Sequence, residues 1–266
     1  MLITLSSAKG APGVTTTALA LGLAWPRPAL IVEADLAGGS IMTGAFRGQI
    51  PNTKGLIPLV AEGLSVDMVR HQSIAFTRDT LHVLPGIVSP VQANALRNMW
   101  TEVSAILSAI ATSGTDIIID MGRTQGTFDD RAALFQEADL NIVAVSSQLP
   151  DIFLTRALAE HMPSDATLAE LAPTRLLIIG PGRPYSKKEI VKSIRLPELG
   201  TIAWDPSNAE HLSIGTPTTR NFRASPLMKS AIAAQSAIDE RVARRREAMG
   251  WSALTQIGRA SCRERV

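Results

Sequence analysis

The chain has 266 residues and a formal net charge of +2, which allows one sizeable hydrophobic core and gives no argument for a strongly basic, nucleic-acid-binding surface. Hydrophobic residues make up 45%, aromatic residues 4% and charged residues 19%, a composition that suits helices packed on a buried sheet. No run approaches about 18 uninterrupted apolar residues and no basic leader precedes the first apolar run, so we expect no membrane span, no signal peptide and a cytoplasmic location.

Short apolar runs alternate with segments of helical spacing along the chain. The runs that we interpret as buried strands are residues 2–6, 29–33, 81–84, 116–119, 140–145, 175–179 and 201–204. The segments that we interpret as helices are residues 13–25, 92–111, 131–138, 152–161, 187–194 and 226–249. This alternation predicts an α/β fold with a mainly parallel sheet covered by helices on both faces, and we expect a single domain over residues 1–256.

The last ten residues, 257–266, differ in character from the rest of the chain. They resemble the translation of a sequencing-library adapter, and we expect them to be a non-native tail. The tail holds Cys262, the one cysteine, so no disulfide or cysteine metal site is expected in residues 1–256. Three arginines and one glutamate give the tail a net charge of +2, and subtracting this from the formal +2 leaves 0 for residues 1–256.

Ligands of parallel sheets lie at the carboxyl ends of the strands, which directs attention to residues 6–16, 33–44, 120–127 and 179–185. The first of these segments joins a strand to a helix through Gly10 and Gly13. Glycines permit the backbone angles with which N–H groups turn toward a phosphate at a helix N-terminus. Thr15 is placed to hold Mg²⁺ and Thr16 to donate a second hydroxyl. A tight strand-to-helix turn without a ligand is the alternative.

Two residues of this loop depart from a standard phosphate-binding loop. Val14 stands at the position of the usual lysine, and Pro12 removes one N–H donor. A charged hydrogen bond is worth about 1.5–3 kcal/mol, so loss of the lysine weakens phosphate binding about 10- to 150-fold. Lys9 is placed to restore part of this loss.

With Lys9 five residues before Val14, the loop resembles the deviant Walker A motif of the ParA/MinD family of P-loop ATPases, Lys-Gly-Gly-x-Gly-Lys-Thr-Thr. The matching residues here are Lys9, Gly10, Ala11, Pro12, Gly13, Val14, Thr15 and Thr16. The resemblance implies a three-layer P-loop NTPase fold, ATP and Mg²⁺ as cofactors, and a homodimer in which Lys9 reaches the partner's nucleotide.

Further segments resemble the same family. Asp35 matches the second Asp of the family's Asp-x-Asp motif, which orients the attacking water and belongs to switch I, whereas Glu33 replaces the first. Asp120 ends a strand similar to Walker B, which implies a role in the Mg²⁺ shell. The metal set implied is therefore Thr15, Asp35 and Asp120, although each aspartate also suits a strand-end turn. The family's base-contacting Asn after the strand at residues 175–179 is replaced by Gly180 and its neighbours.

The variant loop most resembles the CpaE/TadZ-like branch, which implies localisation of a Tad/Flp pilus or secretion apparatus by nucleotide-linked dimerisation. A secretion or pilus ATPase is then the expected partner, and attachment at the inner face of the membrane is an accompanying expectation. Slow or absent ATP hydrolysis follows from Val14, because phosphoryl transfer depends on positioning and charge neutralisation. Two alternatives stay open, namely a nucleotide-independent pseudo-ATPase scaffold and a DNA-partitioning ATPase.

Other chemistry-bearing residues give weaker patterns. The four histidines, at 71, 82, 161 and 211, have no metal-ligand spacing. The basic run at residues 244–246 suits DNA phosphate or an acidic lipid surface, but a solvated helix face paired with Asp239, Glu240 and Glu247 explains it more simply.

Overall fold

The computed structural model describes residues 1–10, 13–50, 53–78, 80–126, 129–163 and 172–250. The tail at 257–266 and the loop residues Ala11 and Pro12 therefore lie outside the described residues.

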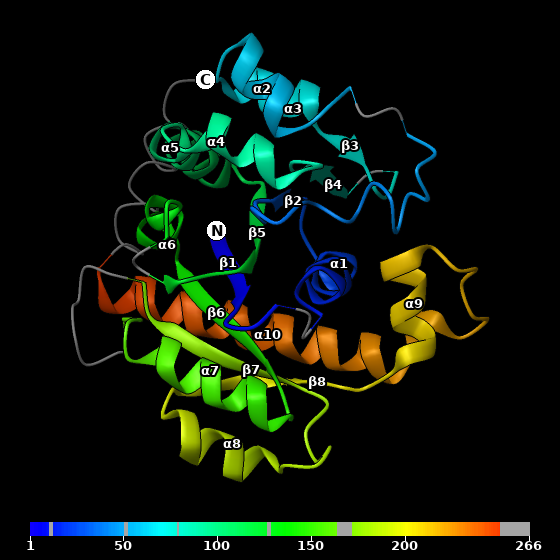
Figure 1. The fold of residues 1–266 in the computed structure, drawn as a ribbon, viewed down its shortest axis with the longest axis vertical. Coiled ribbons are helices and arrows are strands. Elements are labelled where there is room, and N and C mark those ends of the chain that lie inside the picture. The colour runs from blue at the N-terminus through cyan, green and yellow to red at the C-terminus, as the bar shows by residue number, and fades with distance from the viewer. Residues whose placement is uncertain (11–12, 51–52, 79, 127–128, 164–171, 251–266) are drawn as a thin grey trace, which may run out of the picture.

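One eight-stranded sheet runs through the molecule, in the order β3-β4-β2-β5-β1-β6-β7-β8 (Figure 1). Every neighbouring pair is parallel except β3 and β4, which are antiparallel. The strands are β1 (Leu2–Ser7), β2 (Ala29–Glu33), β3 (Ile74–Ala75), β4 (Leu81–Leu84), β5 (Asp116–Arg123), β6 (Leu140–Ser146), β7 (Thr174–Ile179) and β8 (Glu198–Ile202).

Helices cover both faces of this sheet. The α-helices are α1 (Val14–Ala24), α2 (Leu56–Glu62), α3 (Val66–Gln72), α4 (Ala93–Leu96), α5 (Trp100–Thr112), α6 (Ala132–Glu137), α7 (Leu149–Ala159), α8 (Lys187–Ile194), α9 (Pro206–Ile214) and α10 (Pro226–Ala248). Two short 3-10 helices, η1 (Pro90–Gln92) and η3 (Phe222–Ala224), precede α4 and α10.

The core has one apolar layer on each face of the sheet because strand side chains alternate between faces. On one face, α1 and α10 pack against residues such as Ile3, Leu5 and Ile118. On the other face, α5 and α6 pack against residues such as Ile117 and Ile119, and α7 and α8 complete that layer over β6 and β7. This arrangement confirms the predicted three-layer fold with a mainly parallel sheet.

Several predicted boundaries were wrong for identifiable reasons. The segment 92–111 is not one helix, because the Met99 N–H donates to the Leu96 carbonyl over 2.9 Å in a tight turn between α4 and α5. Strand β5 continues past Asp120 because β1 pairs with it as far as Arg123, through an irregularity after Leu5. The last strand is residues 198–202 instead of 201–204.

Helices α2, α3 and α9 were not predicted. The first two are seven residues long and carry too few turns for a clear period. Helix α9 does carry a local signal in the sequence: Asp205 caps it by accepting from the Asn208 N–H, and Pro206 occupies its first turn. In the part of the chain that the structure describes, no helix is long and apolar enough to cross a membrane.

Candidate functional site

The loop between β1 and α1 lies at the carboxyl edge of the sheet. Gly10 and Gly13 have φ angles of +82° and +88°, which glycine adopts without the steric cost that a Cβ would bring. The Gly10 N–H donates to the Ser7 hydroxyl over 3.2 Å. Gly13 is the N-cap of α1, and in the described structure no side chain caps this helix, so the positive end of its dipole faces the loop.

The residue at the expected lysine position belongs to the core. The Val14 side chain is only 5% exposed and packs in the apolar layer around α1. Thr15 and Thr16 follow it and are half-buried at the sheet edge. Position 14 therefore contributes to core packing and supplies no positive charge to the loop.

Asp120 contacts the first turn of α1 through Thr15. It is buried, and its carboxylate accepts from the Gly122 N–H over 2.9 Å and interacts with the Thr15 hydroxyl. The pKa of Asp120 is raised to about 7, chiefly by burial and to a smaller extent by the nearby charges of Glu33 and Asp35, against the opposing effect of the bonds from Thr15 and Gly122. The structure thus brings together Thr15, Asp35 and Asp120, the three residues that the family resemblance gave as a metal set.

Asp35 lies against the turn that follows Asp120. Its Oδ1 accepts from the Ala37 N–H over 2.8 Å. A Cβ placed on Gly122 would lie 2.0 Å from the Asp35 Oδ2, so only glycine allows this contact. Burial raises the pKa of Asp35, while the bond from Ala37 and the charge of Arg131 lower it.

Glu33 has a structural role that its resemblance to a motif aspartate did not reveal. One of its carboxylate oxygens accepts from the N–H groups of Ser40 and Ile41, over 2.8 and 2.9 Å. The other accepts from the Gly86 N–H over 3.2 Å. Burial raises the pKa of Glu33, and these three backbone bonds oppose the rise. Glu33 therefore anchors the segment after Asp35 to the turn after β4.

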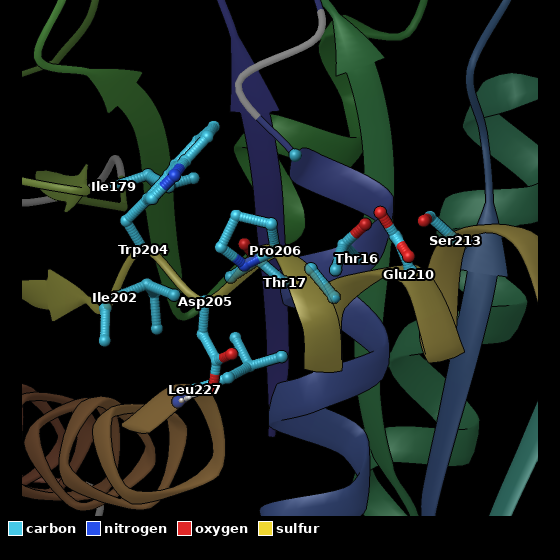
Figure 2. Close-up of a pocket in the computed structure, with 13 residues that line it drawn as sticks. Thr16, Thr17, Ile179, Ile202, Trp204, Asp205, Pro206, Glu210, Ser213 and Leu227 are labelled. Atoms are coloured by element: carbon cyan, nitrogen blue, oxygen red, sulfur yellow. Dashed lines mark hydrogen bonds between the residues drawn. The ribbon is translucent and has the colours of Figure 1, made fainter. Parts of the chain in front are cut away.

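A cavity of about 270 Å³ opens beside the loop, between α1, the ends of β7 and β8, and α9 (Figure 2). Thr16 and Thr17 line it from α1, Trp204 and Asp205 line it from the β8–α9 connection, and Leu227 contributes from α10. Trp204 is 54% exposed, and its ring forms an aromatic wall. Trp204 was not predicted, since the family resemblance implied a base contact from an Asn that this chain replaces.

Lys9 extends from the loop in another direction. Its ammonium group pairs with the Asp151 carboxylate over 3.3 Å, at the start of α7. Both residues line a second cavity of about 290 Å³, together with Arg183, whose guanidinium lies 5.6 Å from the Trp204 ring centroid. The Lys9 side chain is therefore directed toward the start of α7, and it is 48% exposed.

The basic run in α10 is committed to contacts within the chain. Arg244 pairs with Glu240, Arg245 donates to the carbonyls of residues 138 and 139, and Arg246 pairs with the Asp139 carboxylate over 2.9 Å. The expected pairing held for Glu240, whereas Arg246 is paired across the fold with Asp139. Among the described residues, no group of three or more His, Cys, Asp or Glu is placed to hold a metal ion.

Arg131 is a second residue of the site that the sequence did not reveal. It is 1% exposed, and it lies between the segments that carry Asp35 and Asp120, with its guanidinium bonded to the Ala34 and Met121 carbonyls. Its place in the sequence did not indicate a role in the site, because Ala34, one of its hydrogen-bond partners, is 97 residues away.

The comparisons with known proteins identify the fold. No family model matches the chain, and no curated protein matches its sequence. The fold is similar to that of MinD from Pyrococcus horikoshii complexed with Mg-ADP, at 18% identity and a TM-score of 0.69, over 92% of this chain and 98% of that one. It is likewise similar to a ParA family ATPase from Chlorobium tepidum, at 16% identity and a TM-score of 0.69, over 88% and 97% of the chains.

A third similar structure is MinD in a MinC:MinD complex from Aquifex aeolicus, at 16% identity and a TM-score of 0.66, over 90% and 95% of the chains. At these identities the comparisons show the ParA/MinD fold.

Proposed function

We propose that this chain is a ParA/MinD-type protein that binds ATP and Mg²⁺ at the start of α1. The observation that carries this proposal is the meeting of three features at one edge of the sheet. These are a helix N-terminus without a side-chain cap, the contact of Thr15 with Asp120, and a cavity lined by Thr16 and Thr17. The helix N-terminus suits a phosphate, the Thr15 and Asp120 oxygens suit its Mg²⁺, and the cavity suits a nucleoside.

The phosphates would be held by the loop from Lys9 through Thr16, including Ala11 and Pro12. Thr15, Asp35 and Asp120 offer the oxygen donors that Mg²⁺ prefers, and Mg²⁺ usually completes its coordination with phosphates and waters. Bound Mg²⁺ would neutralise phosphate charge. In this proposal, Asp35 orients the attacking water, and the Trp204 wall receives the base in place of the missing Asn.

Hydrolysis is expected to be slow or absent. Val14 is buried in the core and contributes no charge to the phosphates. Lys9 is paired with Asp151 of the same chain. Transition-state stabilisation in phosphoryl transfer depends on such cations, so their absence lowers the rate more than it lowers binding.

We further propose that nucleotide links two copies of the chain face to face and that the dimer localises a Tad/Flp pilus or secretion apparatus, by contact with its ATPase at the inner face of the membrane. The exposed Lys9 supports the first part, because it can leave Asp151 for a phosphate on a partner. MinD in a MinC:MinD complex is an example of a similarly folded protein with a protein partner. The resemblance to CpaE/TadZ-like proteins supports the pilus role.

Two other functions make different predictions. A pseudo-ATPase scaffold would dimerise equally with and without nucleotide. A DNA-partitioning ATPase would bind DNA in an ATP-dependent and salt-dependent manner. In the free chain Arg244 and Arg246 are paired with carboxylates of the chain itself, so binding of DNA through α10 would first have to break these pairs.

The test is calorimetric titration of the full chain with ATP in the presence of Mg²⁺ or EDTA. We expect binding that weakens about 10-fold or more in Thr15→Ala, because a hydrogen bond to a charged ligand is lost. Val14→Lys should tighten binding, and its thermal unfolding must be measured alongside because Val14 is a core residue. Trp204→Ala should weaken binding about 2- to 12-fold through lost stacking.

Ser193→Ala is a matched control for Thr15→Ala, since it removes a half-buried helix hydroxyl on α8, away from the site. Absence of binding to the unmodified chain at millimolar ATP would overturn the nucleotide proposal and leave the scaffold. Light scattering with and without nucleotide then separates linked from unlinked dimerisation.

A further inference from the structure

A buried guanidinium joins the two segments that carry the candidate metal carboxylates. Arg131 Nη1 donates to the carbonyl of Ala34 over 2.6 Å and to that of Met121 over 2.5 Å. Nη2 donates to the Arg123 carbonyl over 2.8 Å. Ala34 immediately precedes Asp35 and Met121 immediately follows Asp120, so one side chain fixes the backbone next to both carboxylates.

The remaining donors of Arg131 are held by Asp129. Nε lies 2.7 Å from Asp129 Oδ1 and Nη2 lies 2.6 Å from Oδ2, a bidentate pair. Together with the three carbonyls, these bonds occupy all five N–H groups of the guanidinium. Burial opposes ionisation of Asp129, but the bonds and charge of Arg131 hold its pKa below the usual range.

Asp129 connects this pair to the turn that follows β5. The Thr124 hydroxyl donates to Asp129 Oδ2 over 2.9 Å, and the Gln125 N–H donates to the same oxygen over 3.3 Å. The two segments also touch directly, because the Ala34 N–H donates to the Asp120 carbonyl over 2.7 Å. Arg131 and Asp129 thus hold residues 121–125 and the end of β2 as one hydrogen-bonded unit.

A lysine cannot make these contacts. It has three donors on a single nitrogen, whereas the guanidinium presents five donors in a plane that reaches both segments at once. Loss of Arg131 would leave two buried carbonyls, one partly buried carbonyl and a buried carboxylate to find other partners. Arginine is therefore required at position 131 for the geometry of its donors as well as for its charge.

We propose that Arg131 is a positioning residue that couples the segments carrying Asp35 and Asp120, so that a Mg²⁺-nucleotide bound beside Asp120 also orders the segment carrying Asp35. This inference rests on the proposed nucleotide site. It adds that Arg131 links the segment carrying Asp35 to the segment carrying Asp120, so that both respond to bound nucleotide. Arg131 acts through the backbone and is not placed in contact with ligand.

The test uses Arg131→Lys in the full chain, with Arg175→Lys as a matched control. Arg175 is also 1% exposed but lies at the start of β7 and donates to the Thr174 carbonyl. Hydrogen exchange followed by mass spectrometry on the free protein reports on each segment. We expect faster exchange in Arg131→Lys at residues 34–41 and 121–126 together, and no such change at these residues in Arg175→Lys.

The second readout is the ratio of ADP affinities with Mg²⁺ and with EDTA. Coupling changes of this kind amount to about 2- to 30-fold, so we expect Arg131→Lys to reduce the Mg²⁺-dependent ratio by that factor while the affinity in EDTA is kept. Asp129→Asn keeps the carbonyl bonds of Arg131 and should give a smaller reduction, which provides a second variant if Arg131→Lys does not fold.

Equal exchange changes throughout the chain in Arg131→Lys, with the Mg²⁺-dependent ratio unaltered, would overturn the proposal and leave Arg131 as a general stabilising residue. Exchange changes in only one of the two segments would also overturn it. If the unmodified chain binds no nucleotide, the proposed function fails, whereas the exchange comparison on the free protein still decides whether Arg131 couples the two segments.

Discussion

The Lys9 ammonium lies 3.3 Å from the Asp151 carboxylate, which links the loop before α1 to the first turn of α7. Asp151 is 6% exposed and its other oxygen accepts from the Ser146 hydroxyl. The carboxylate is therefore held in place by a contact that does not involve Lys9. In the proposed dimer, Lys9 exchanges this carboxylate for a phosphate on the partner. The contact is therefore a competitor of dimerisation.

We predict that Asp151→Asn dimerises at lower ATP concentration than the unmodified chain. A partly exposed ion pair contributes about 0–1 kcal/mol, so the midpoint should fall by up to about five-fold. Sedimentation velocity across an ATP titration measures it. Glu198→Gln is the control, since it removes the exposed pair with Lys187 on the neighbouring helix α8. A midpoint that rises in Asp151→Asn would contradict the prediction.

Asp120 is predicted to make stability depend on pH. Because burial raises its pKa to about 7, the folded protein retains a proton that the unfolded chain releases near pH 4. The stabilisation from this carboxyl is therefore fully present below about pH 4 and is lost as pH rises through about 7.

The measurement is urea unfolding of the unmodified chain and Asp120→Asn at pH 5, 6, 7 and 8. Asparagine does not titrate, so the stability of the variant relative to the unmodified chain should increase with pH, by at most about 1.4 kcal/mol per unit. A difference that stays constant over this range would show that Asp120 is ionised throughout.

Gly122→Ala is predicted to disturb Asp35 as well as the backbone. A Cβ at this position would lie 2.0 Å from the Asp35 carboxylate, and φ at Gly122 is +56°. Gly114→Ala is the matched control, because φ there is +107° and the added Cβ would meet no atom within 4 Å.

We expect both alanine variants to lose about 1 kcal/mol or more from backbone strain, and Gly122→Ala to lose a further 1–3 kcal/mol from the clash. Thermal unfolding measures the loss. Mg²⁺-dependent nucleotide affinity should fall in Gly122→Ala alone. An equal fall in Gly114→Ala would show that the loss of affinity does not depend on the contact with Asp35.

Glu33→Ala is predicted to release the segment after Asp35. Three backbone N–H groups, of Ser40, Ile41 and Gly86, lose their acceptor. Each buried unsatisfied group costs about 1–3 kcal/mol, and water entering the space offsets part of this, so we expect a net loss on the order of 3 kcal/mol.

Limited proteolysis within residues 36–48 should accelerate in the same variant. Glu62→Ala is the control, since Glu62 is exposed and accepts one bond from Gln72. Unchanged proteolysis in Glu33→Ala would mean that other contacts hold the segment.

The sequence alone determined the architecture of this protein. The strands at 29–33 and 81–84 and the helix at 187–194 have the predicted bounds, because each is a local run with one clear apolar pattern. The alternation of such runs was sufficient for a parallel sheet with helices on both faces. It also placed Gly13, Thr15 and Asp120 at the same sheet edge, because parallel strands end together.

The tertiary structure decided which polar groups meet. Arg131 bonds to Ala34, which is 97 residues away, and Lys9 meets Asp151 across the same edge. Trp204 forms a wall of the cavity beside the loop, whereas the family resemblance implied a base contact from an Asn after the strand at residues 175–179. The physical reason is that apolar periodicity is a local property of the chain, whereas the partner of a charged or hydrogen-bonding side chain is fixed only when packing brings distant segments within about 3 Å.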